Sequence, residues 1–161
     1  MKQIKTYINE KLRLTTKRQY TCQPKNWNEL RQIILQRIED EGYECDLNDI
    51  DVSKITFMGS LFDAFVCGNV FKNFDGDVSQ WNVSNVTNMA HMFSGCKKFN
   101  CDISRWDVSN VENMDLMFYG CEKFNQNLNS WDVSNVDAKN MTLAFYNCPT
   151  TPTWYDKDTL E

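Results

Sequence analysis

The chain repeats one six-residue phrase three times, at a constant spacing of 25 residues. Trp81-Asn82-Val83-Ser84-Asn85-Val86 recurs as Trp-Asp-Val-Ser-Asn-Val from Trp106 and again from Trp131. Units that recur every 20 to 50 residues cannot bury their apolar faces alone and stack on their neighbours. A fourth, degenerate copy places Ile50 in the Trp position. The spacing therefore predicts a short solenoid of about four coils.

The repeat template divides the chain into three parts. We expect an N-terminal helical segment and cap at 1–43, a repeat solenoid at 44–148 and a C-terminal tail at 149–161. The extra residues that separate Phe62 from Val78 are expected to form a loop, because insertions in solenoids map to loops. The four repeats are predicted at about 46–76, 77–101, 102–126 and 127–148.

Each repeat carries two patterns of apolar residues. Residues 78–83 and their equivalents are β-branched and aromatic, which favours a short strand. Residues 89–96 place apolar side chains at i, i+3, i+4 and i+7, which favours a short helix. The fold class predicted is α/β, with one strand and one helix per coil. The repeated inward positions are Trp81, Trp106, Trp131, Phe93, Phe118, Phe145, Cys96, Cys121 and Cys148.

The N-terminal part predicts two amphipathic helices. The first follows the apolar spacing of residues 4–12. The second covers residues 27–41, with Asn26 as N-cap, Glu29 in capping-box spacing and Gly42 as its stop. The open end of a stack leaves an apolar cross-section uncovered, so we expect the second helix to cap the first coil.

The cysteines favour reduced thiols. Their number is seven, and Cys96, Cys121 and Cys148 recur at one repeat position, which indicates a buried ladder of unpaired thiols. No Cys-x-x-Cys pair occurs and the chain has one histidine, so we expect no metal site and no cofactor.

Charge is divided unevenly along the chain. Residues 1–25 hold seven Lys/Arg against one Glu, a net charge of +6, whereas residues 26–161 hold ten against 21 Asp/Glu, a net charge of −11. The basic residues are spread over an amphipathic pattern and the acidic body would repel phosphates, so no nucleic-acid partner is expected. No apolar run suits a membrane span or a secretion signal, and we expect the chain to stay in the cytoplasm of the producing cell.

A search for catalytic chemistry finds none. His91 occupies a repeat position filled elsewhere by Ser60, Leu116 and Leu143, so the repeat does not reserve it for a base. Asp75-Gly76-Asp77 lacks the further oxygen ligands of a calcium loop and reads as a turn. No nucleophile motif or phosphate-binding loop occurs. We therefore expect no catalytic residue and no enzyme.

The repeated phrase also resembles a known family. Asp102-Ile-Ser-x-Trp-Asp-Val-Ser-Asn-Val-x-Asn-Met-x-x-Met-Phe-x-x-Cys121 is similar to the BspA-type leucine-rich-repeat family, also described as Mycoplasma-type lipoprotein repeats, and the match covers about residues 44–148. The resemblance implies a leucine-rich-repeat-like solenoid. It also implies a surface or secreted binding protein or adhesin, although the chain begins with no export signal or lipid-attachment cysteine. A short version of this kind looks more like a protein made inside bacteria, by a phage or another mobile element.

Repeats without catalytic residues predict a protein–protein interaction module whose partner is another protein. The alternatives are a structural or virion-associated component that acts by self-association, and a surface adhesin as the family resemblance implies. Outward positions that vary between repeats are where a partner would contact the chain. An acidic stripe that includes Asp51 could serve as that surface or as solvated charge. The expected contact residues, on the strand side, are Gln80, Arg105, Ser130, Asp107 and Asp132.

Overall fold

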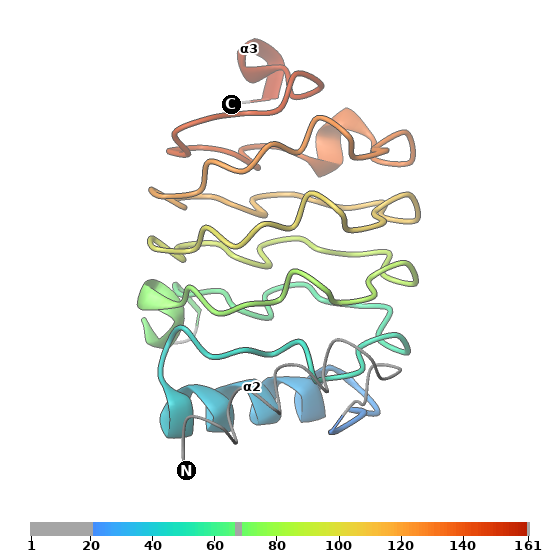
Figure 1. Cartoon of the computed structure of the whole chain (residues 1–161). Helices are drawn as coiled ribbons and strands as arrows, with labels where there is room; N and C mark the ends of the chain where they lie inside the picture. Colours follow the sequence, from blue (N-terminus) through green and yellow to red (C-terminus); the bar gives the residue numbers. More distant parts are fainter. Residues whose placement is uncertain (1–20, 67–68, 161) are drawn as a thin grey trace, which may run out of the picture.

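The computed structural model describes residues 21–66 and 69–160, and the helix expected around residues 4–12 lies outside them. The backbone winds repeatedly around an apolar core, and the windings lie one above another between α2 (Trp27–Glu41) and α3 (Lys157–Leu160) (Figure 1). Two 3-10 turns, η1 (Val70–Asn73) and η2 (Ala138–Asn140), interrupt the windings. We name the windings by the sequence copies that they contain: first (46–76), second (77–101), third (102–126) and fourth (127–148).

The helix predicted at residues 27–41 is confirmed as α2. The Asn26 side chain accepts a hydrogen bond from the Glu29 backbone N–H, and the Glu29 carboxylate accepts one from the Lys25 N–H at 2.8 Å. The Gly42 N–H closes the helix on the Ile38 carbonyl. Local capping signals therefore define both ends of α2.

One face of α2 covers the end of the stack. Leu30, Ile34 and Ile38 are buried in the core. On the same helix, Trp27 Nε1 donates to the Gly59 carbonyl at 3.0 Å, and Arg31 Nη1 donates to the Ser60 and Leu61 carbonyls at 2.9 and 3.0 Å. These side-chain donors satisfy carbonyls of the first winding that have no winding beneath them.

The predicted α/β solenoid of four coils, with a strand and a helix in each, is wrong. Across the part of the chain that the structure describes there is no sheet, only isolated parallel bridges such as Asp46 with Asp77 and Asn88 with Asn113. The expected repeat helix at residues 89–96 is a run of turns. Within residues 21–66 and 69–160 the chain is built mainly from turns and irregular extended segments, and α2 is the one long helix among them.

The backbone at one recurring position explains why helices do not form. Ser60, His91, Leu116 and Leu143 all have φ between 51° and 59°, in the left-handed region. A left-handed residue reverses the chain direction and ends an α-helix. The i, i+3, i+4 spacing of apolar residues therefore arises from consecutive tight turns, each of which returns a side chain to the core.

Aspartate and asparagine side chains prevent strands on the opposite side of each winding. Asn82 Oδ1 accepts from the Ser84 N–H, and Asp107 and Asp132 accept from Ser109 and Ser134 in the same way, at 3.1 to 3.2 Å. Such turns compete with a strand ladder for the backbone N–H groups. This competition overrides the β-propensity of the valines and isoleucines around them.

Three rows of equivalent side chains connect the windings, two through the core and one on the outside. The phenylalanines stack, with ring centroids 5.2 Å apart for Phe62–Phe93, 5.7 Å for Phe93–Phe118 and 5.2 Å for Phe118–Phe145. Each tryptophan Nε1 donates to a carbonyl of the preceding winding. These bonds run from Trp81 to Leu47, from Trp106 to Val78 and from Trp131 to Ile103, at 2.9 to 3.2 Å. On the outside, Asn85, Asn110 and Asn135 donate to Ser53, Ser84 and Ser109.

The tryptophan row continues into the C-terminal tail. Trp154 Nε1 donates to the Leu128 carbonyl at 2.9 Å, and its ring stacks on Trp131 at 6.5 Å. Tyr155 is buried and packs edge-on against Phe145 at 5.0 Å. Residues 152–155 thus begin a further, incomplete winding that covers the last complete one.

Candidate functional site

The cysteines at the repeated position lie inside the stack. Cys96 and Cys121 are fully buried, whereas Cys148 is half-buried because the winding above it is incomplete. Their thiols donate to the carbonyls of Phe62, Phe93 and Phe118 at 3.0 to 3.1 Å. Burial raises the pKa of the Cys121 thiol well above its ordinary value. A protonated, enclosed thiol is a structural donor rather than a nucleophile.

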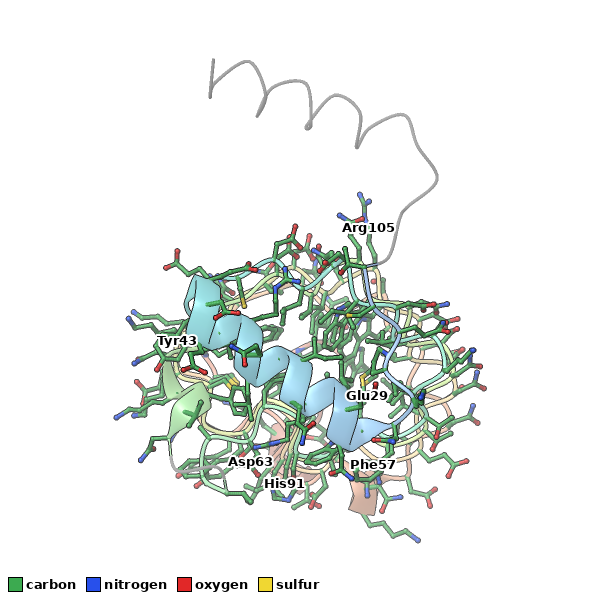
Figure 2. The ribbon with its side chains drawn as sticks, turned by 90° about the horizontal axis from the view of Figure 1, so that it is seen from below. Glu29, Tyr43, Phe57, Asp63, His91 and Arg105 are labelled. Carbon is green, nitrogen blue, oxygen red and sulfur yellow. The ribbon has the colours of Figure 1, made fainter. Side chains whose placement is uncertain are left out.

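The five residues expected to contact a partner are all exposed, on three successive windings. They are Gln80 in the second, Arg105 and Asp107 in the third, and Ser130 and Asp132 in the fourth. Figure 2 shows Arg105 at one edge of the molecule, with Asp63 and His91 at the opposite edge. We call the surface formed by these five residues the Arg105 face.

The carboxylates of the Arg105 face are occupied by local turns. Asp107 Oδ1 accepts from both the N–H and the hydroxyl of Ser109, the latter at 2.6 Å. Hydrogen bonds from Ser109 lower the pKa of Asp107, and those from Ser134 lower the pKa of Asp132. Ser130 likewise donates to the Ser104 carbonyl at 3.2 Å. Asp107 and Asp132 therefore form local turns, and the partner-contact role expected of the Arg105 face stays a prediction.

A row of aromatic rings, exposed at Phe65 and Tyr146 and half-buried at Tyr119, joins the first, third and fourth windings elsewhere on the molecule. Phe65, from the insertion of the first winding, meets Tyr119 of the third edge-on, with ring centroids 6.0 Å apart. Tyr119 stacks on Tyr146 of the fourth at 5.1 Å and an interplanar angle of 14°. Phe65 is 62% exposed and Tyr146 is 38% exposed. We call Phe65, Tyr119 and Tyr146 the aromatic row.

Two glycines lie beneath the row, and one of them makes room for it. Gly95 and Gly120 have φ of 75° and 71°, where a side chain would be strained. A Cβ on Gly95 would also lie 2.8 Å from Cε2 of Phe65, too close for a carbon–carbon contact. Phe65 can therefore pass over the second winding and reach Tyr119 because the position between them carries no side chain.

The insertion that carries Phe65 is fastened at its beginning. Asp63 is 2% exposed, and its Oδ1 accepts from the N–H groups of Phe65 at 2.8 Å and Val66 at 3.2 Å. The Asn69 N–H then donates to the Ala64 carbonyl at 2.9 Å. Val66 and Val70, on the same insertion, are 75% and 39% exposed. The insertion thus presents apolar side chains to solvent on an anchored backbone.

His91 lies next to this anchor. Its Nδ1 is 3.7 Å from Oδ2 of Asp63, and its side chain is 40% exposed. Burial raises the pKa of Asp115 in the third winding, and the charge of His91 nearby opposes that rise. No group of three or more potential metal ligands lies together within residues 21–66 and 69–160.

The aromatic row was not predicted from the sequence. Its three rings come from an insertion and from two different repeats, so no single stretch of sequence contains the pattern. A signal was nevertheless present, since Tyr119-Gly120 and Tyr146-Asn147 place a tyrosine before a left-handed residue at the same repeat position. Ser94-Gly95 fills that position in the second winding with a small side chain.

Comparison with known proteins identifies a family without an assigned activity. Residues 32–155 match the family model described as "Mycoplasma protein of unknown function, DUF285". No curated protein and no solved structure matches the chain. Within the residues that the structure places, no helix has both the length and the apolar character to cross a bilayer.

Proposed function

Because this chain belongs to the DUF285 family, whose description assigns no function, we propose from its surface that it is a non-enzymatic protein-interaction module. The observation that carries the proposal is the aromatic row. Large aromatic side chains dominate the binding energy of protein interfaces. An exposed, contiguous cluster of them on a soluble chain is a recognised mark of a contact site.

The geometry of the row suits binding because the rings are held in place before a partner arrives. Tyr119 and Tyr146 support each other by stacking, and Phe65 is positioned by its contact with Tyr119. Side chains that are already ordered lose less conformational entropy on association. The backbone beneath them is fixed by Gly95 N–H to Tyr119 carbonyl and Gly120 N–H to Tyr146 carbonyl bonds of 2.7 and 2.8 Å.

The partner that we propose is a protein with a basic surface around an apolar centre. The body of the chain, residues 26–161, has a net charge of −11, which favours association with positive charge. The apolar centre would meet the aromatic row and its neighbour Val66. The finer resemblance to the BspA-type repeat family, whose members are mostly regarded as binding proteins and adhesins, supports binding rather than catalysis.

The test compares two variants of the full chain. The row variant carries Phe65→Ser, Tyr119→Ser and Tyr146→Ser, and serine is suitable at residue 119 because Ser94 fills the equivalent position. The matched variant of the Arg105 face carries Gln80→Ala, Arg105→Glu and Ser130→Ala. Each is used to capture proteins from a lysate of the producing cells, with thermal melting as the folding control.

We expect a defined captured protein to be lost with the row variant and kept with the Arg105-face variant. The reverse result would move the contact site to the Arg105 face. A second candidate function is self-association as a structural component, and light scattering of the wild-type chain tests it by measuring mass against concentration. Concentration-dependent growth in mass that the row variant abolishes would favour that function over binding to a different protein.

A further inference from the structure

The anchor of the insertion contains a charge pair that the repeats do not require. Asp63 is almost completely buried, and a buried carboxylate is unfavourable unless hydrogen bonds and a positive charge compensate it. Its Oδ1 accepts two backbone N–H groups, from Phe65 and Val66. The group that faces its other oxygen, Oδ2, is the His91 imidazole at 3.7 Å. The carboxylate thus connects His91 to the backbone of the aromatic row.

The backbone position of His91 does not explain the choice of histidine. All four residues at this repeat position are left-handed, and the others are Ser60, Leu116 and Leu143. The His91 N–H donates to the Asp115 carbonyl at 2.8 Å, as the Leu116 N–H does to Thr142 at 3.0 Å. Leucine therefore serves the same backbone role, and what His91 adds is a side chain that can carry charge beside Asp63 and Asp115.

We infer that His91 is a positioning residue that holds the aromatic row together in response to pH. When the imidazole is protonated, its charge compensates the charge of the buried Asp63 carboxylate. The carboxylate then keeps its hydrogen bonds from the N–H groups of Phe65 and Val66, and these bonds hold Phe65 over Gly95. When the imidazole is neutral, this compensation is lost and the beginning of the insertion opens more often. The consequence for binding rests on the proposed function, whereas the positioning of the insertion does not.

The surroundings of His91 define the other groups that could respond. Asp63 and Asp115 are the ionisable side chains recorded beside it. His91 is the sole histidine of the chain, and histidine is the residue type that changes charge between pH 5 and 8. Asp115 has a raised pKa because it is buried, and it faces His91 from the third winding. An Asp115→Asn variant separates its contribution.

The experiment measures amide hydrogen exchange by NMR on the full chain at about pH 5.5 and about pH 8, the interval in which histidines change charge. Exchange rates are converted to protection factors, which removes the intrinsic pH dependence. We expect protection of the Phe65 and Val66 amides to fall roughly fivefold at the higher pH, as expected for loss of a partly exposed ion pair. The core amides of Phe93 and Phe118 should not change.

Two variants decide whether His91 is responsible. His91→Leu fits the left-handed position and should give low protection of Phe65 and Val66 at both pH values. Asp63→Asn keeps an acceptor oxygen for the two N–H groups but removes the charge, so the pH dependence should disappear. Equal pH dependence in wild type and His91→Leu, or a dependence that only Asp115→Asn removes, would overturn the inference. Failure of the row variant to affect capture would refute the proposed function and leave this result standing.

Discussion

The Arg105 face and the aromatic row are two sides of one stack of windings, and they are built differently. On the Arg105 face, Asp107 and Asp132 bond to their own turns and Ser130 bonds to the preceding winding. On the other side, an insertion from the first winding passes over Gly95 and meets tyrosines of the third and fourth. The Arg105 face is thus built from contacts within a winding or between neighbouring windings, whereas the aromatic row also needs the insertion of the first winding.

The largest expected effect lies in the core that both sides share. Phe118 is fully buried and contacts Phe93, Phe124 and Phe145, with ring centroids 4.3 to 5.7 Å apart. Phe118→Ala should lower the free energy of unfolding by about 3–5 kcal/mol, because a large side chain is lost between windings on both sides. Denaturant titration measures the change in the free energy of unfolding. A loss under about 1 kcal/mol would mean that the stack tolerates a break in its central row.

A second prediction compares the two glycines beneath the aromatic row. Gly95→Ala introduces strain at positive φ and a collision with the Phe65 ring, so we expect a loss of roughly 2–3 kcal/mol. Gly120→Ala introduces the same strain, but the nearest atom is 3.9 Å away, and a loss of about 1 kcal/mol is expected. Thermal melting of the two variants compares the two losses of stability. Adding Phe65→Ala should recover part of the Gly95→Ala loss and none of the Gly120→Ala loss.

Acid should lower the stability that the turn of Asp107 contributes on the Arg105 face. Hydrogen bonds from Ser109 depress the pKa of Asp107 in the folded chain. Their contribution to stability is therefore present above the unfolded value, about 3.9, and is lost as the pH falls through the folded value. Asp107→Asn should make the melting temperature less dependent on pH below about 4, by at most about 2 °C.

Asparagine is the matched replacement at this position because Asn82 makes the same two bonds to Ser84 in the second winding. The melting temperature at neutral pH should therefore stay nearly constant in Asp107→Asn. A large loss at neutral pH would show that the charge of Asp107, rather than its acceptor oxygen, supports the turn.

The smallest effect on stability is expected at Phe65. The ring is largely exposed and touches one aromatic neighbour, so Phe65→Ser should change the melting temperature by less than about 1 °C. The same substitution should reduce capture of the partner strongly, although it barely changes the melting temperature. A substantial loss of stability would instead make the aromatic row a structural contact, and the contrast between the two sides of the molecule would no longer hold.

The sequence predicted those features whose causes are local. Helix α2 carries its own caps and apolar stripe, and its bounds agree with the pattern at residues 26–42. The buried tryptophans and phenylalanines follow from their repetition. The predicted repeat helices were wrong because Leu116 and Leu143 adopt a left-handed conformation that their residue type disfavours, and bonds between windings, such as that from the Leu116 N–H to the Thr142 carbonyl, help to stabilise it. The predicted strands were wrong because the side chains of Asp107 and Asp132 bind backbone N–H groups in local turns.

The candidate site was less predictable because it is formed by residues far apart in the chain. Residues 65 and 119 meet across a winding that contributes only a glycine to the contact. The outward positions on the Arg105 face were identified correctly as exposed, but exposure alone does not separate a binding residue from one that closes a turn. Asp107 and Asp132 accept hydrogen bonds in local turns, and the contact role predicted for them stays a prediction.

Trp154 has a consequence for how such a chain can change in length. The residue that covers the last complete winding uses the same indole-to-carbonyl bond that joins each winding to the one before it. Termination therefore needs no interface of its own, because Trp154 would fit above any winding that offers a carbonyl equivalent to that of Leu128. Loss or duplication of a 25-residue unit in the gene would leave both ends of the molecule intact. The height of the stack, and with it the number of rings in the aromatic row, can thus vary while the closing segment stays the same.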